Sequence, residues 1–316
     1  QFCCIVMDCL WKNHRRRRII WPLGAHREYC MDASRSGWIY GFIGVAIFSG
    51  SLPATRVAVA DFDPVFLTII RAAIAGVLAL TLLVFVPQKL PQKSQLVALL
   101  IVALGVVVGF PLLTALALQH ITSARSIVFI GLLPLATALF AMLRAGDRPQ
   151  PAFWLFSTAG SMLVAGFAFT QDLSASWTGD LLMFAAIIVC GLGYAEGAKL
   201  ARILGGWQVI SWALVISLPV MAPLALYMMP ATFAGISQPA WLALAYVSVF
   251  SMLIGFVFWY RGLAQGGIAA VGQLQLLQPF MGLSLAAVLL GEDVSWLMAA
   301  VSLSVIVCVA GARKFA

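Results

Sequence analysis

Charged side chains are scarce in this sequence. Asp, Glu, Lys and Arg together make up 9% of its 316 residues, whereas hydrophobic residues make up 63%. In a soluble globular domain about a quarter of the residues are charged. So few charges cannot cover a surface that faces water, but they suffice for a surface that faces lipid. The composition therefore excludes an ordinary soluble domain and predicts an all-α integral membrane protein.

The signatures of common enzyme and metal sites are missing as well. No Walker loop, HExxH or GxSxG motif occurs in the chain. The six cysteines follow neither a disulfide framework nor the spacing of zinc ligands, and His14, His26 and His120 are widely scattered. No apolar segment has an acidic residue near its middle, which argues against proton antiport. We therefore expect no enzymatic activity, no cofactor and no metal.

What the chain does have is a long series of apolar segments. A helix needs roughly 20 predominantly apolar residues to cross the hydrocarbon core. Short breaks with turn residues or charges separate the segments, and residues 1–36 are expected to form a cytosolic tail or an upstream extension. The predicted spans cover residues 37–59, 64–86, 96–118, 122–144, 151–170, 177–198, 207–229, 239–262, 268–290 and 295–312.

The distribution of Lys and Arg sets the expected orientation. With the N-terminus inside, nine Lys and Arg residues after the tail fall on inner segments, against only Arg56 and Arg125 outside. Positive residues are enriched on the cytoplasmic side of membrane proteins. Both termini are therefore expected inside.

The two halves of the chain resemble each other. The segment PLATALFAMLRAGD from Pro134 aligns without a gap to PFMGLSLAAVLLGE from Pro279, so that Gly146-Asp147 corresponds to Gly291-Glu292. Five spans form one repeat, and an odd number turns the second copy upside down. The chain is thus predicted to hold two inverted five-helix repeats, residues 37–170 and 177–312. Inverted repeats are typical of secondary transporters.

These features resemble the EamA type of the drug/metabolite transporter superfamily. The resemblance covers residues 37–312 and is carried by a proline followed by a Gly-acidic pair in the fourth helix of each half. It implies a central cavity lined by helices one, three and four of the first half and six, eight and nine of the second. Similar proteins export amino acids, other metabolites or toxic compounds, and some take solutes up.

Polar residues in the second half are candidates for substrate contact, because polar groups are costly at membrane depth. Gln275 and Gln278 share a helix face beside Pro279, where an amide offers both donors and acceptors. Ser251 belongs to a stripe of small residues that would equally suit close packing of helices. The aromatic candidates are Tyr194 and Tyr246. Bridging between helices is the alternative role of both amides.

The first half contributes fewer candidates. Ser49 and Thr114 are the hydroxyl residues selected there for substrate contact. Two further residues could act in coupling or in ion pairs. Glu196 is expected to pair with Lys199 one turn away, and Arg71, about 10 Å into its helix, is expected to pair with Asp61 or Asp63 rather than to bind a carboxylate. The expected bending points are Pro53, Pro111, Pro134, Gly191, Gly193 and Pro279.

Together these features predict a secondary transporter that works by alternating access and exports amino acids or related small metabolites. A multidrug or nucleoside exporter is the alternative within the transporter class, and a passive channel or an intramembrane enzyme is the alternative outside it. The expected partners are a small-molecule substrate and membrane lipid, with no nucleic acid. The expected location is the bacterial plasma membrane, as a multi-pass protein.

Overall fold

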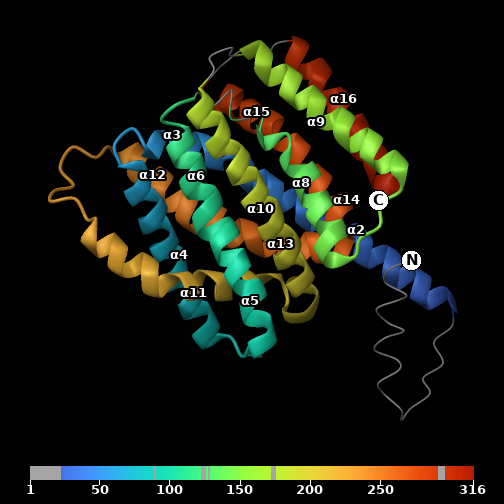
Figure 1. Cartoon of the computed structure of the whole chain (residues 1–316), viewed down its shortest axis with the longest axis horizontal. Coiled ribbons are helices and arrows are strands. Elements are labelled where there is room, and N and C mark those ends of the chain that lie inside the picture. The colour runs from blue at the N-terminus through green and yellow to red at the C-terminus, as the bar shows by residue number, and fades with distance from the viewer. Residues whose placement is uncertain (1–22, 89, 122–125, 127–128, 172–175, 291–295) are drawn as a thin grey trace.

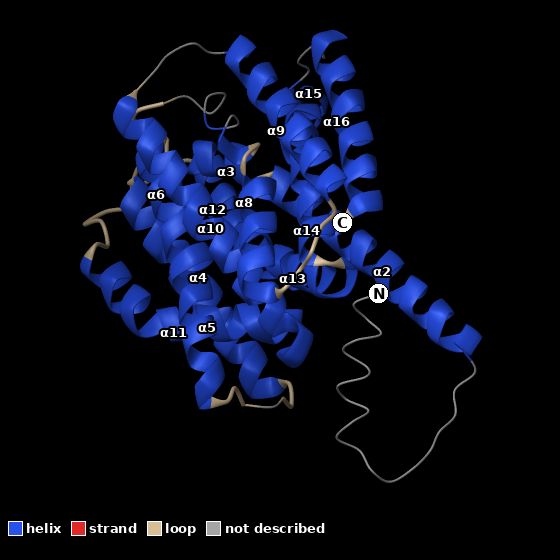
Figure 2. Cartoon of the chain, turned by 45° about the vertical axis from the view of Figure 1, so that its right-hand side comes forward, coloured by secondary structure: helices blue, strands red, loops and turns tan. Residues whose placement is uncertain are grey.

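The computed structural model describes residues 23–88, 90–121, 126, 129–171, 176–290 and 296–316, and this part of the chain contains helices and loops but no strand (Figure 2). The helices are α2 (Leu23–Ser49), α3 (Ser51–Ala58), α4 (Pro64–Phe85), α5 (Lys93–Val102), α6 (Phe110–Ala117), α8 (Leu133–Phe140), α9 (Pro151–Gln171), α10 (Trp177–Leu204), α11 (Gly206–Tyr227), α12 (Gln238–Ala245), α13 (Gly255–Gly266), α14 (Ile268–Gly272), α15 (Gln278–Leu290) and α16 (Trp296–Phe315).

Six helical stretches among these residues are long and apolar enough to cross a membrane. They cover Arg35–Ala58, Pro64–Phe85, Lys93–Ala117, Trp177–Leu204, Gly206–Tyr227 and Gln238–Gly266. Large apolar side chains are exposed along them, for example Val84, Val97 and Leu242. Because hydrocarbon is the environment that such a surface requires, the chain is an integral membrane protein with several spanning helices.

Several helical stretches change their winding at a proline. Pro111 and Pro134 are each the second residue of their helices, α6 and α8. Pro279 is the second residue of α15, directly after the 3₁₀ segment Gln273–Leu277, and Pro53 is the third residue of α3 after the turn at Gly50. A proline has no N–H to donate to the preceding turn and is tolerated at the start of a helix. These four predicted bending points therefore coincide with interruptions.

The glycines Gly191 and Gly193 behave differently. They do not interrupt their helix in this conformation, because α10 runs from Trp177 to Leu204 without a break. A Cβ at Gly191 would lie 2.9 Å from the Cβ of Ala136, and one at Gly193 would lie 2.8 Å from Val106. The two glycines thus allow α10 to approach its neighbours closely, which is a common use of small residues between helices in membranes.

The helices pack in pairs that join the two halves of the chain. The helix α2 packs along α13, α4 along α11, and α9 along α16, whereas α10 packs on α5, α6 and the π-helical segment Ala103–Gly109 between them. The helix α8 packs on α14. In Figure 1, α9 and α16 form one edge of the bundle, α4 and α11 lie on the opposite side, and α10 runs between them. Every one of these pairs takes one member from each half.

The closest of these contacts is between α2 and α13. A Cβ at Gly262 would lie 2.5 Å from the backbone nitrogen of Gly41, and one at Gly37 would lie 2.3 Å from that of Gly266. Only glycine allows two backbones to approach this closely. The helix α2 is thus fixed against the second half at Gly37 and Gly41, near its middle.

Candidate functional site

A cavity lies between the two halves. Its volume is about 70 Å³, which is room for a few water molecules but less than the roughly 300 Å³ of a typical ligand site. This conformation is therefore nearly closed. The lining residues come from α2, α3, α4, α6, α8, α10, α13, α15 and their irregular connections: Phe48, Ser51, Thr55, Arg71, Val106, Phe110, Pro111, Thr114, Ile130, Leu133, Tyr194, Ser251, Phe256 and Gln278.

Among the described residues, Arg71 is the only charged one in this lining. Its side chain is 8% exposed, and its Nε has no hydrogen-bond partner among the described residues. The expected pairing with Asp61 or Asp63 is wrong. Asp63 instead accepts hydrogen bonds from the backbone nitrogens of Val65 (2.9 Å) and Phe66 (2.8 Å), and so caps the start of α4. An uncompensated guanidinium therefore lies at the wall of the cavity.

Neutral polar groups from both halves complete the lining. Ser51 Oγ donates to Ser251 Oγ at 2.7 Å, and Gln278 Nε2 donates to the Phe48 carbonyl oxygen at 3.3 Å. Both bonds join the first span to the second half. Thr114 Oγ1 is buried without a hydrogen-bond partner among the described residues. The cavity thus contains donors and acceptors that the protein does not fully use.

The rest of the cavity wall is largely aromatic. The rings of Phe48 and Phe256 meet edge to face with 5.0 Å between their centroids, and Tyr194 contacts Phe256 at 6.0 Å. Trp259 lies behind them, fully buried, 5.5 Å from the ring of Tyr194. These contacts hold the aromatic wall in a fixed shape.

The structure separates the predicted contact residues into two groups. Gln278, Tyr194, Ser251, Thr114 and Arg71 line the cavity. The remaining candidates have other environments in this conformation: Ser49, Tyr246 and Gln275.

Each residue of the second group has a local explanation. Ser49 Oγ donates to the carbonyl oxygen of Ala46 in its own helix at 2.6 Å. Tyr246 donates to the carbonyl oxygen of Ile47 at 2.7 Å and stacks on Phe250. Gln275 is fully buried beside Tyr194, and no described group completes a hydrogen bond to its amide.

Two lining hydroxyls were not selected from the sequence. Ser51 and Thr55 lie four residues apart, and both reach the cavity from α3. Residues four apart share one face of a helix, so this spacing was the available signal. It was obscured because Ser49, two residues earlier, is also a hydroxyl in the same apolar segment.

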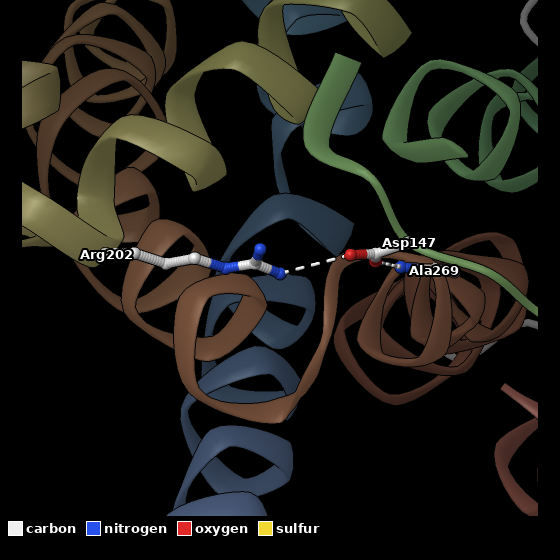
Figure 3. A network of polar contacts seen from close by, with 3 residues as sticks. All are labelled: Asp147, Arg202 and Ala269. Carbon is white, nitrogen blue, oxygen red and sulfur yellow. Dashed lines mark hydrogen bonds and ion pairs between the residues drawn. The ribbon is translucent and has the colours of Figure 1, made fainter. Parts of the chain in front are cut away.

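Ionic contacts gather at the end of the bundle where α8 leads towards α9. Glu196 is 3% exposed and pairs with Arg144, so the expected partner Lys199 is wrong. Asp147 accepts a hydrogen bond from Arg202 Nη2 at 3.3 Å and another from the backbone nitrogen of Ala269 at 3.2 Å. Figure 3 shows Asp147 between these two donors. Its counterpart in the repeat, Glu292, lies outside the described residues. This network joins α10 and α14 of the second half to the segment after α8.

On the loop between α3 and α4, Asp61 makes a further contact between the halves. Its carboxylate accepts hydrogen bonds from the backbone nitrogen of Ser237 (2.9 Å) and from the Ser237 hydroxyl. These bonds stabilise the ionised form and so lower the pKa of Asp61. Ser237 is also the N-cap residue of α12. The loop before α4 is thus attached to the loop before α12.

The lowered pKa of Asp61 predicts a pH effect on stability. A carboxylate whose pKa is lower in the folded than in the unfolded protein stabilises the fold at pH values above its unfolded pKa of about 4. This stabilisation is lost as the pH falls through the folded pKa. The melting temperature of the purified protein should therefore decrease when the pH is lowered below about 5, and Asp61→Asn should make that decrease smaller. Thermal melts of both proteins in detergent from neutral to acidic pH measure this. Parallel curves would mean that Asp61 contributes nothing.

Comparison with known proteins finds a matching family profile and similar curated proteins. The sequence profile of the EamA-like transporter family matches residues 35–169 and, a second time, residues 177–313. Among curated proteins, the uncharacterized transporter YdeK of Bacillus subtilis strain 168 is 68% identical over 286 residues, which is 90% of this chain and 100% of that protein. The uncharacterized transporter YyaM of the same strain is 23% identical over 235 residues, 71% of this chain and 77% of that protein.

A solved crystal structure supports the arrangement of helices. It superimposes with a TM-score of 0.72 at 20% sequence identity, over 89% of this chain and 99% of that chain. At this identity the likeness concerns the fold alone. Among the described residues no group of three or more His, Cys, Asp or Glu side chains could hold a metal ion.

Proposed function

Because the chain belongs to the EamA-like transporter family, we propose that it is a secondary transporter that works by alternating access and exports amino acids or related small metabolites. The cavity between the two halves is the observation on which this proposal rests. Polar side chains from both halves line it, as a site needs if each half in turn closes one side of the membrane.

The proposed architecture is ten spanning helices in two inverted five-helix repeats, residues 37–170 and 177–312. The helix pairs support it. In the two repeats α2 corresponds to α10, and the α5–α6 stretch corresponds to the stretch that ends in α13. Interchanging the repeats therefore turns the contact between α2 and α13 into the contact between α10 and the α5–α6 stretch. The pairs α4–α11, α9–α16 and α8–α14 each join two corresponding segments, so the interchange leaves them unchanged. A two-fold relation between the repeats requires this pattern of contacts. The double match of the family profile agrees with it.

The proposed location is the bacterial plasma membrane, with both termini inside. The excess of Lys and Arg on the segments assigned to the inner side supports this orientation. Asp147, Arg202, Arg144 and Glu196 then lie at the inner end of the bundle, and Asp61 and Ser237 at the outer end. Contacts between the halves at both ends fit the small volume of the cavity.

Within this cavity we propose Gln278, Tyr194, Ser251 and Thr114 as the substrate contacts. An amide, a phenol and hydroxyls suit a small polar solute, and the aromatic wall suits an apolar side chain on that solute. An amino acid combines both features. The alternative proposal is a multidrug or nucleoside exporter, which the aromatic part of the wall would also suit.

Counterflow in proteoliposomes tests the proposed function. Vesicles loaded with an unlabelled amino acid should take up the same labelled compound faster than empty vesicles, with saturation. A panel of amino acids, nucleosides and lipophilic cations separates the two transporter proposals. Uptake without exchange stimulation would instead indicate a channel, and no uptake of any compound by folded protein would refute the proposed function.

A further inference from the structure

We propose that Arg71 is the recognition site for a carboxylate, so that the substrate is a carboxylate-bearing solute and not a cation. This inference rests on the proposed function and specifies its substrate class. It starts from the guanidinium, which is buried, lines the cavity and has no ionic partner among the described residues.

A buried charge without a partner is costly. Charged residues at membrane depth usually pair with each other or line a solute pathway, and removing ions from water is compensated only by close opposite charge and hydrogen bonds. Arginine keeps its proton under all physiological conditions. The charge on Arg71 therefore has to be compensated by something other than proton loss.

Four acidic side chains that the structure describes, two close to Arg71 in sequence and two on other helical segments, bind groups other than Arg71. Asp61 binds Ser237, and Asp63 caps α4. Glu196 pairs with Arg144, and Asp147 binds Arg202 and Ala269. None of the described residues that line the cavity is acidic. A negative charge that enters the cavity is thus the available partner for Arg71, and the substrate supplies it.

The chemistry of the surrounding groups favours a carboxylate in particular. A guanidinium offers two parallel N–H donors to the two oxygens of a carboxylate. The Thr114 hydroxyl, unpaired on α6, lies on a helix that packs against α4, from which Arg71 projects. It can donate to the same anion. A cationic solute would instead face an uncompensated like charge in a poorly hydrated space.

The test compares an amino acid with its amide, which keeps the amino group and has an uncharged carboxamide in place of the carboxylate. Labelled phenylalanine and leucine are measured by counterflow against competition by unlabelled phenylalanine, phenylalaninamide and phenylpyruvate. Wild-type protein should discriminate between acid and amide by about tenfold or more, because a hydrogen-bonded charge contact of this kind is typically worth at least that factor. In Arg71→Gln that ratio should fall below about threefold, and Arg71→Lys should retain an intermediate ratio.

Arg56→Gln is the matched control, because Arg56 is an exposed arginine on α3 that does not line the cavity. Its acid-to-amide ratio should equal that of the wild type. Phenylpyruvate, which lacks the ammonium group, should compete in the wild type if the carboxylate is the recognised feature. An unchanged ratio in Arg71→Gln, or equal competition by acid and amide in the wild type, would overturn the inference.

A binding measurement separates this inference from the proposed function. The melting temperature of detergent-purified protein is measured with each acid and each amide, which requires no transport. Stabilisation by acids alone, lost in Arg71→Gln, with no counterflow would refute the transport function but not the carboxylate site. Counterflow of amino acids with equal stabilisation by acid and amide would refute the carboxylate site alone. Absence of any stabilisation by the acids would overturn the site as well.

Discussion

Replacing Arg144 by alanine is expected to lower the free energy of unfolding by about 2 to 3 kcal/mol, somewhat less than the roughly 3 to 5 kcal/mol typical of a fully buried pair. Glu196 is 3% exposed, and Arg144, whose side chain is 50% exposed, is its ionic partner. Without Arg144 the carboxylate would stay buried and uncompensated. Denaturant unfolding in detergent, followed by tryptophan fluorescence, measures the loss.

The double variant Arg144→Ala/Glu196→Gln should recover most of this stability, because no uncompensated charge remains in it. Arg148→Ala is the matched single control. It removes an exposed arginine from the same segment, one that forms no ion pair with another described residue. If Arg144→Ala proves as stable as Arg148→Ala, the ion pair contributes nothing to folding.

The helices themselves were largely predictable from hydropathy and turn residues. The predicted range 64–86 agrees with α4 (Pro64–Phe85), because Asp63 and Pro64 are a capping residue and a favoured first helical residue. The prolines at 111 and 279 were also informative, since each removes a backbone hydrogen bond. The glycines in α10 were less informative, because a glycine in a membrane helix can also serve close packing, as Gly191 and Gly193 do here.

The partners of the polar residues were not predictable in the same way. Sequence spacing identifies neighbours on one helix, which is why Lys199 was the expected partner of Glu196. The observed partner, Arg144, is 52 residues away in the chain. Arg71 shows the opposite error. Two aspartates lie close to it in sequence, but capping and the bond to Ser237 engage both of them. Contacts of this kind depend on which helices pack together.

Of the two glutamines predicted to share a helix face, only Gln278 is expected to matter for transport. Gln278 lines the cavity and donates to the carbonyl oxygen of Phe48, which leaves its own carbonyl oxygen available. Gln275 lies behind Tyr194, away from the lining. The structure thus gives different environments to two residues whose spacing of three places them on one helix face, so the spacing alone did not show which of them reaches the cavity.

Gln278→Met should therefore reduce the rate of amino-acid counterflow about tenfold, the value of one net hydrogen bond to a polar substrate. Gln275→Met, the same change three residues earlier, should leave the rate within about twofold, because it removes a buried amide that has no hydrogen-bond partner among the described residues. Initial rates are compared at equal amounts of reconstituted protein. The reverse order of the two effects would mean that the substrate contacts Gln275, beside Tyr194, and that Gln278 is not a contact residue.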